Sequence, residues 1–89
     1  MYVNLVEVHN NSISDRGSHF LREIWINSNH VVHFREDMDL RKAMADGLLP
    51  SDLNDHQTFT RIYVACGSQF FSTSVVGSPM LIWEKLDAA

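Results

Sequence analysis

The sequence predicts an α+β domain built on a small bent antiparallel sheet of about five strands, with a C-terminal helix and a short inserted helix. Two features of the last third of the chain carry this prediction. Residues 60–65 and 70–76 are rich in β-branched and aromatic residues, and the turn-forming segment 66–69 separates them. Ser78 and Pro79 then supply an N-cap and a first-turn proline for a helix from residue 79 to about 86, in which Ile82, Trp83 and Leu86 share one face.

Three earlier segments have the composition of strands. In residues 2–9, Val3 and Leu5 lie on one face and Val6 and Val8 on the other. Residues 20–26 form a second strand after a long turn-rich connection at 10–18, and residues 30–34 form a third after a tight turn at 27–29. With 89 residues, the chain has the size of a single domain, residues 1–89.

Between the third and fourth strands lies an acidic helix-loop insert at about 36–57. Asp37 or Asp39 can cap a short helix that runs through Asp46, and Gly47 is placed to end it. The insert carries six carboxylates against Arg41 and Lys42; they are Glu36, Asp37, Asp39, Asp46, Asp52 and Asp55. Such a patch would steer a basic partner surface, or else it is a solvated segment whose acids keep it soluble and cap its helix.

Composition makes several classes of function unfavourable. A net charge of −4 with scattered basic residues disfavours nucleic acid as a direct ligand. The single cysteine, Cys66, excludes an internal disulfide and fits a reducing compartment. No apolar run approaches the ~18 residues of a membrane span, and the N-terminal residues lack a basic signal-peptide region. We therefore expect a cytoplasmic protein with no membrane contact.

The side chains that could carry chemistry do not form a recognisable catalytic pattern. His30 and His33 are three positions apart on an expected strand, where they point to opposite faces, so we expect no metal site. Cys66 has no base nearby in the sequence to activate its thiol. No glycine pattern suggests a phosphate loop or a nucleophile elbow. We expect a protein that is not an enzyme and needs no cofactor.

Exposed apolar residues are the other candidates for function. The terminal helix carries apolar residues on more than one face. Either the sheet and the insert clasp it from both sides, or Met80, Leu81 and Trp83 form a subunit interface. Trp25 is out of phase with Ile24 and Ile26, so it is either a core residue of the second face or an exposed aromatic anchor.

Several of these pieces together resemble the small β-rich bacterial and phage proteins of the flagellar FlbD type. The matching pieces are residues 25–32, 60–64, Gly67, Phe71 and 75–78, within regions 22–35 and 58–87. The chain departs from that pattern in the insert, where the family has only a few residues. It also departs in Met80 and Leu81, which stand where the family's helix has acidic residues. The resemblance implies a small non-catalytic accessory protein of bacterial or phage origin.

The resulting hypothesis is a non-enzymatic protein-binding accessory or inhibitory factor, encoded by a phage or mobile element and acting in the cytoplasm of a bacterial host. Its expected partner is a basic surface of a host protein, such as a defence or nucleic-acid-binding complex, because carboxylates can occupy a site that evolved for phosphates. The expected contact residues are Asp37, Asp39, Asp46, Asp52, Asp55 and Trp25. The alternative is a small structural or assembly subunit that forms a homodimer or larger oligomer through the helix residues Met80, Leu81 and Trp83.

Overall fold

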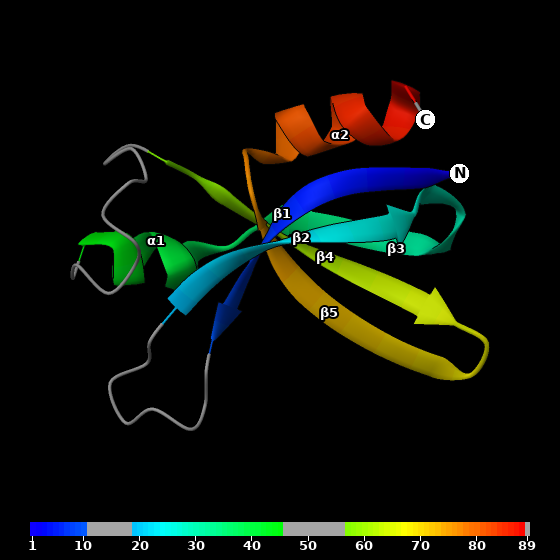
Figure 1. Cartoon of the computed structure of the whole chain (residues 1–89), viewed down its shortest axis with the longest axis horizontal. Helices are drawn as coiled ribbons and strands as arrows, with labels where there is room; N and C mark the ends of the chain where they lie inside the picture. Colours follow the sequence, from blue (N-terminus) through cyan, green and yellow to red (C-terminus); the bar gives the residue numbers. More distant parts are fainter. Residues whose placement is uncertain (11–18, 46–56, 89) are drawn as a thin grey trace.

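The computed structural model describes residues 1–10, 19–45 and 57–88 of the chain (Figure 1). Its elements are β1 (Tyr2–Asn10), β2 (His19–Asn27), the 3-10 turn η1 (Ser28–His30), β3 (Val31–Glu36), α1 (Met38–Ala45), β4 (Phe59–Cys66), β5 (Gln69–Val76) and α2 (Pro79–Ala88). This order confirms the five strands, the inserted helix and the C-terminal helix predicted from the sequence. Most boundaries differ from the predicted ones by one or two residues; for example, His30 ends η1, and the third strand begins at Val31 and continues to Glu36.

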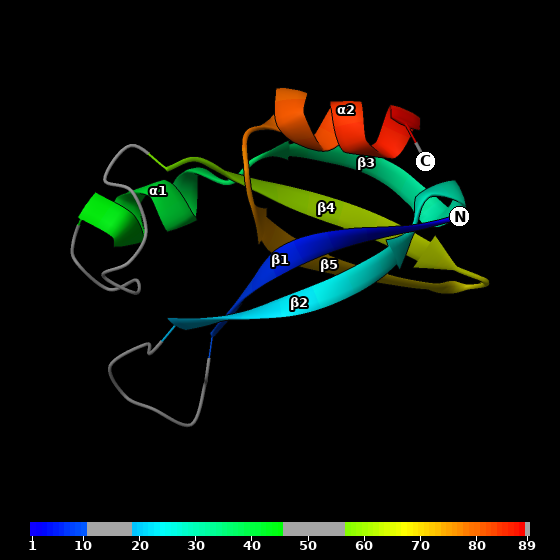
Figure 2. The same cartoon turned by 45° about the horizontal axis from the view of Figure 1, so that its top comes forward.

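The strands form one open antiparallel sheet in the order β2-β1-β5-β4-β3. Within each of the pairs β1–β2 and β4–β5 the strands are paired along their whole length. Among the described residues, the two pairs meet only where Glu7 and Val8 of β1 face Val75 and Ser74 of β5. Beyond that short junction they diverge, so in Figures 1 and 2 β1 and β2 cross over β4 and β5.

The main core lies on one face of this sheet, under α2. It comprises Val3, Leu5, Ile26, Ile62, Val64 and Val75 from four strands, and Ile82 from α2. These residues alternate along their strands, as the two-residue period of a half-buried sheet requires. Val3 and Leu5 therefore share the inner face, as the sequence predicts.

Helix α2 begins as its sequence predicts. The Ser78 hydroxyl accepts a hydrogen bond from the amide of Leu81 at 3.2 Å, which caps the first turn. The helix buries Ile82 and half-buries Leu86, whereas Trp83 is exposed, so the face predicted for these three residues is only partly covered by the sheet. Among the described elements, neither helix has the length and apolar character needed to cross a bilayer.

A second, smaller core lies beneath α1, at the other end of β4. Val8, Phe59 and Leu40 of α1 pack together there, with Leu21 and Val76 at the margin. In Figures 1 and 2, α1 lies at the end of the sheet away from α2. The described part of the insert therefore does not clasp the terminal helix; it covers its own end of the sheet.

Candidate protein interface

Asp37 joins α1 to the sheet. Its backbone amide donates to the carbonyl of Phe59 at 2.8 Å, and its carboxylate accepts the amide of Leu40 at 3.1 Å, which caps α1. The same carboxylate accepts a hydrogen bond from the Ser74 hydroxyl and lies 3.3 Å from the guanidinium of Arg61. With only 4% of its surface exposed, Asp37 is an internal connector.

Glu7 plays a similar part on the inner face of the sheet. Its carboxylate accepts the Thr73 hydroxyl on one oxygen, and the Nε of Arg22 lies 2.6 Å from the other. Thr73 and Ser74 are neighbours on β5, so their side chains leave the strand on opposite faces. Each hydroxyl thereby reaches a different buried carboxylate, and the two pairs tie β1, β5 and the start of α1 together.

Both carboxyl groups stay ionised more readily than usual. Burial raises the pKa of Asp37, but the hydrogen bonds from Ser74 and Leu40 and the charge of Arg61 outweigh it and hold the pKa below its ordinary value. Burial likewise raises the pKa of Glu7, and the contacts with Thr73 and Arg22 more than offset that effect. Because the pKa of each group is lowered in the folded chain, its ionised form stabilises the fold at neutral pH.

The predicted acidic surface patch therefore loses one of its members. The prediction that Asp37 contacts a partner is wrong, because its side chain is enclosed by Ser74, Leu40 and Arg61. Asp39 is exposed in the first turn of α1 and stays available to solvent. Glu36 is half-buried, and its carboxylate lies 3.7 Å from the guanidinium of Arg41. Asp46, Asp52 and Asp55 lie outside the described residues.

At the opposite end of β4 and β5, large apolar side chains are exposed instead. We call this surface the aromatic end, formed by Tyr2, Trp25, Val32, Phe70 and Phe71, each with more than half of its surface accessible. Trp25, 58% exposed, is thus an outward-facing aromatic residue and not part of a second core.

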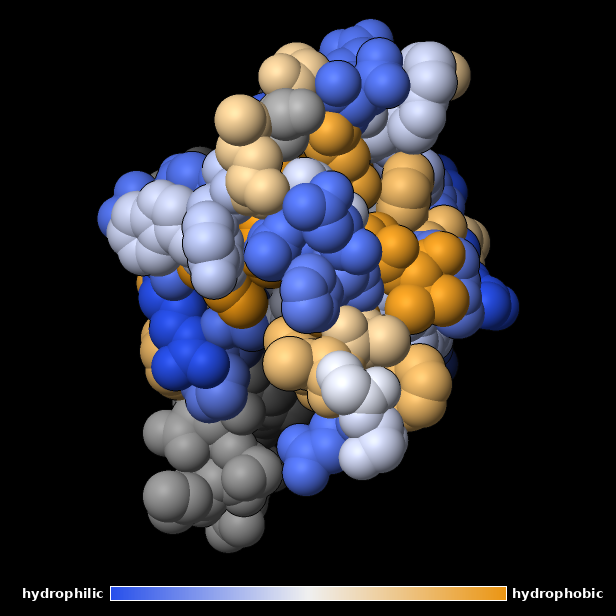
Figure 3. Space-filling model, turned by 90° about the vertical axis from the view of Figure 1, so that its right-hand side faces the viewer, coloured by the Kyte–Doolittle hydropathy of each residue, from blue (hydrophilic) through white to orange (hydrophobic). Residues whose placement is uncertain are grey.

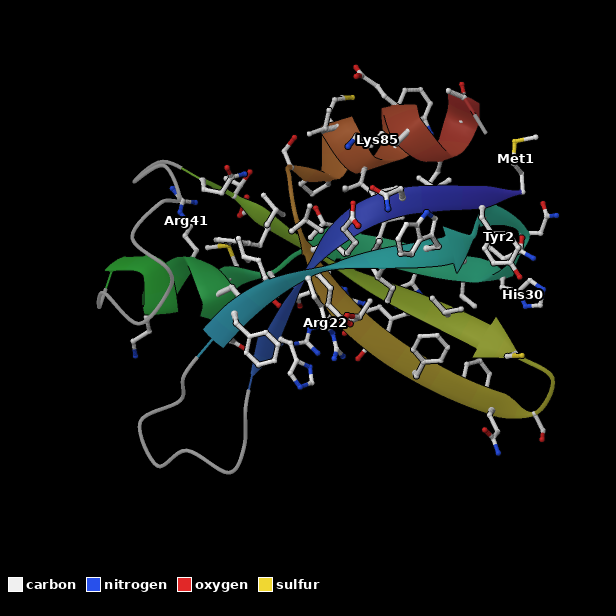
Figure 4. All side chains as sticks on the ribbon, in the orientation of Figure 1. Met1, Tyr2, Arg22, His30, Arg41 and Lys85 are labelled. Atoms are coloured by element: carbon white, nitrogen blue, oxygen red, sulfur yellow. The ribbon has the colours of Figure 1, made fainter. Side chains whose placement is uncertain are left out.

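Two hollows divide the aromatic end and share Phe71. One, of about 340 Å³, lies among Val32, Tyr63 and Phe70; the other, of about 240 Å³, lies among Tyr2, Trp25 and His30. Figure 4 shows Tyr2 and His30 projecting at this end of the molecule, far from Arg41 on α1. Figure 3 looks onto this end and shows hydrophobic groups alternating with hydrophilic ones. Apolar hollows bordered by polar groups are a common feature of protein-binding surfaces.

Polar side chains gather around Tyr63 beside the first hollow. The ring of His33 stacks on Tyr63 with a centroid distance of 4.3 Å, and the Arg35 guanidinium lies 5.6 Å from the same tyrosine centroid. The stacked His33 and Tyr63 rings both line the hollow. The sequence singled out His33 only as a metal candidate, and it gave no signal for this stack, which depends on the register between β3 and β4.

The outer side of α2 forms a separate exposed group. Met80, Leu81 and Trp83, the predicted interface residues, are all exposed. They are brought together on one helix, but the aromatic end and Asp39 belong to other parts of the surface. The exposed part of α2 is therefore a patch separate from the aromatic end.

Metal-ligating side chains do not cluster in the part of the chain that the structure describes. No group of three or more His, Cys, Asp or Glu side chains there could surround an ion. The Nδ1 of His30 lies 3.0 Å from the carbonyl oxygen of Ala65, a contact that fastens η1 to the end of β4. Cys66 is an exposed free thiol at the β4–β5 turn.

Comparison with known proteins found no relative of this chain. The chain matches no protein-family model, and searches of curated proteins and of solved structures give no significant match.

Proposed function

We propose that this chain is a non-enzymatic protein-binding factor whose contact surface is the aromatic end. The observation that carries the proposal is the exposure of Phe70 and Phe71 on a strand whose other half is buried. Exposing several large apolar side chains at one end has a solvation cost that binding would recover, since burying each stabilises by about 1.5–3 kcal/mol. Aromatic residues around hollows are the usual anchors of protein interfaces.

The nature of the partner follows from charge. The chain carries a net charge of −4, so a basic protein surface is its favoured partner. Within this proposal the chain acts as an accessory or inhibitory factor of a phage or mobile element, occupying a basic surface of a bacterial host protein. Asp39 supports such steering from the described part of the insert, whereas Asp37 takes no part in it.

The test is affinity capture from a bacterial host lysate with the wild-type chain and a Phe70→Ser/Phe71→Ser variant. We expect the variant to lose its specific partner while keeping its circular dichroism spectrum and unfolding midpoint. Met38→Ser is the matched control, because Met38 is comparably exposed but lies on α1 at the other end. Equal capture by wild type and the Phe70/Phe71 variant would refute the aromatic end as the contact surface.

A second candidate function is that of a structural subunit assembled through α2. It is favoured by the exposure of Met80, Leu81 and Trp83 on one short helix. Light scattering over a range of concentrations tests it. A dimer that Leu81→Lys dissociates would support assembly, and a monomer at all concentrations would exclude it.

A further inference from the structure

The outer edge of β3 has no partner strand among the described residues. β3 ends the strand order and pairs only with β4, so its outward-facing N–H and C=O groups meet no neighbouring strand. Such an edge can accept another extended segment through main-chain hydrogen bonds.

A groove follows this edge on the side of α2. It has a volume of about 270 Å³ and is lined by Val31, His33 and Phe34 from β3, and by Trp83, Leu86 and Asp87 from α2. Its lining includes consecutive residues of β3, whose side chains point to opposite faces. The groove therefore runs along the strand edge itself, with the end of α2 as its wall.

The other face of the same strand borders the hollow of about 340 Å³ described above. Val32 and His33 line both spaces, while Tyr63 and Phe70 complete the second one. The register of β3 against β4 shifts between Val31 and His33. Val32 is thus the extra residue of a bulge, which places it at the edge between the two spaces.

From this arrangement we propose that the β3 edge binds an extended peptide segment of a partner protein as a sixth strand. The segment would carry a lysine or arginine directly beside a large apolar residue. This inference rests on the proposed function as a protein-binding factor and names the form and chemistry of its partner.

The alternation of an extended chain explains this pair of residues. Neighbouring side chains of a strand point to opposite faces, so one enters the α2 groove and the next enters the hollow beside Tyr63. In the groove, the exposed Trp83 ring can receive a cationic side chain whose charge meets the Asp87 carboxylate. In the hollow, Val32, Tyr63 and Phe70 present an almost entirely apolar surface, which suits an aliphatic or aromatic side chain.

A second copy of this chain fits the groove less well than a basic peptide. Two copies would each carry a net charge of −4, so their pairing would bring like net charges together. A basic segment instead complements both the α2 wall of the groove and the net charge of −4.

The experiment uses the full chain, labelled with ¹⁵N, and peptides selected from a random 12-residue display library. We expect selected peptides to share a basic residue next to a large apolar one. Their binding should shift the amide resonances of Val31–Glu36 and the indole resonance of Trp83. N-methylation of a peptide amide that pairs with β3 should weaken binding at least tenfold, because one main-chain hydrogen bond is lost and its acceptor is left unpaired. This ligand-side change needs no variant of the protein.

Protein variants on α2 test the groove. Trp83→Ala should weaken binding about tenfold and Asp87→Asn about threefold, the latter because exposed ion pairs contribute little. Glu84→Gln serves as the control for Asp87→Asn, since Glu84 is exposed on the same helix but does not line the groove. Trp83→Ala and Asp87→Asn should both keep the thermal unfolding midpoint of the wild type within a few degrees.

Each outcome decides between the two proposals. Peptides that shift Tyr2, Trp25 and Phe71 but leave β3 unmoved would overturn the groove and retain the aromatic end. A failure to select any peptide would overturn the groove, and the lysate capture then decides the proposed function independently. Concentration-dependent broadening of β3 resonances without peptide would show a second copy at the edge, which also overturns the peptide proposal.

Discussion

The two ends of the β4–β5 hairpin differ in which kind of side chain they bury and which they expose. Near α1, the sheet buries two carboxylates and gives each of them hydroxyl and guanidinium partners. Near the Gly67 turn, the same two strands expose phenylalanines to solvent. Polar groups are inside at one end and aromatic groups are outside at the other.

This contrast shows which end holds the fold together and which is free for binding. At the junction, a buried charge is tolerated only because it is paired and hydrogen-bonded, so the residues there are mutually dependent. At the aromatic end, Phe70 is mostly exposed, so its truncation should cost the fold little. Substitutions of the same kind at the two ends therefore separate stability from binding.

The largest expected difference comes from Phe59→Ala and Phe70→Ala, the same substitution at opposite ends of one hairpin. Phe59 is completely buried against Val8 and Leu40, and its truncation should lower the free energy of unfolding by about 3–5 kcal/mol. Phe70 is 75% exposed, and its truncation should change that free energy by less than about 0.5 kcal/mol. Urea unfolding measures both, and equal losses would contradict the division of roles between the two ends.

The next effect concerns the carboxylate that caps α1. Asp37→Ala removes the cap and leaves Arg61 and Ser74 without their buried partner, so we expect a loss of about 2–3 kcal/mol. Asp39→Ala is the matched control in the same helical turn and should cost about 0.5 kcal/mol. A wild-type midpoint for Asp37→Ala in thermal unfolding would show that the junction does not depend on this residue.

The junction should also make stability depend on acid. In the folded chain the pKa values of Glu7 and Asp37 lie below the ordinary values of 4.5 and 3.8, so the unfolded chain binds more protons at low pH. The stabilisation from both groups is complete above these ordinary values and is lost as the pH falls through the lowered folded values. The urea concentration at the unfolding midpoint, measured from pH 7 to pH 2.5, should decrease once the pH is below about 4.5. A Glu7→Gln/Asp37→Asn variant should show a smaller decrease. An equally steep fall in that variant would assign the acid sensitivity to other groups.

The sequence was sufficient for the elements whose local signals agree. The N-cap at Ser78, the alternation of Val3 and Leu5 and the glycine turn at 67 each depend on residues close together in the chain, and the structure has all three. The N-cap of the inserted helix could also be predicted, since Asp37 was one of the two candidates, with Asp39. What the sequence could not give is that the capping carboxylate also meets Ser74, because that contact joins residues 37 positions apart.

Part of the buried network can be predicted from the sequence. Glu7 continues the inward alternation of Val3 and Leu5, so a carboxylate was placed in phase with the core, where it needs internal partners. The partners themselves depend on strand order, since Thr73 reaches Glu7 only because β5 pairs with β1. In the same way, Trp83 falls outside the core because α2 contacts β3 and β4 at an angle that the helical period does not determine.

The smallest expected effect tests how the aromatic end is held in shape. Gly67 has a φ of +62° in the two-residue turn between β4 and β5, and a side chain at this position would meet no atom within 4 Å. Gly67→Ala should therefore cost only the backbone strain of a left-handed residue, about 1 kcal/mol, with no steric clash. Ser68→Ala is the control in the same turn, where φ is not positive, and it should be neutral. If Gly67→Ala lowers the urea midpoint without changing the capture of a partner, the turn sets stability alone. If capture falls more than the midpoint explains, the turn also positions Phe70 and Phe71 for contact.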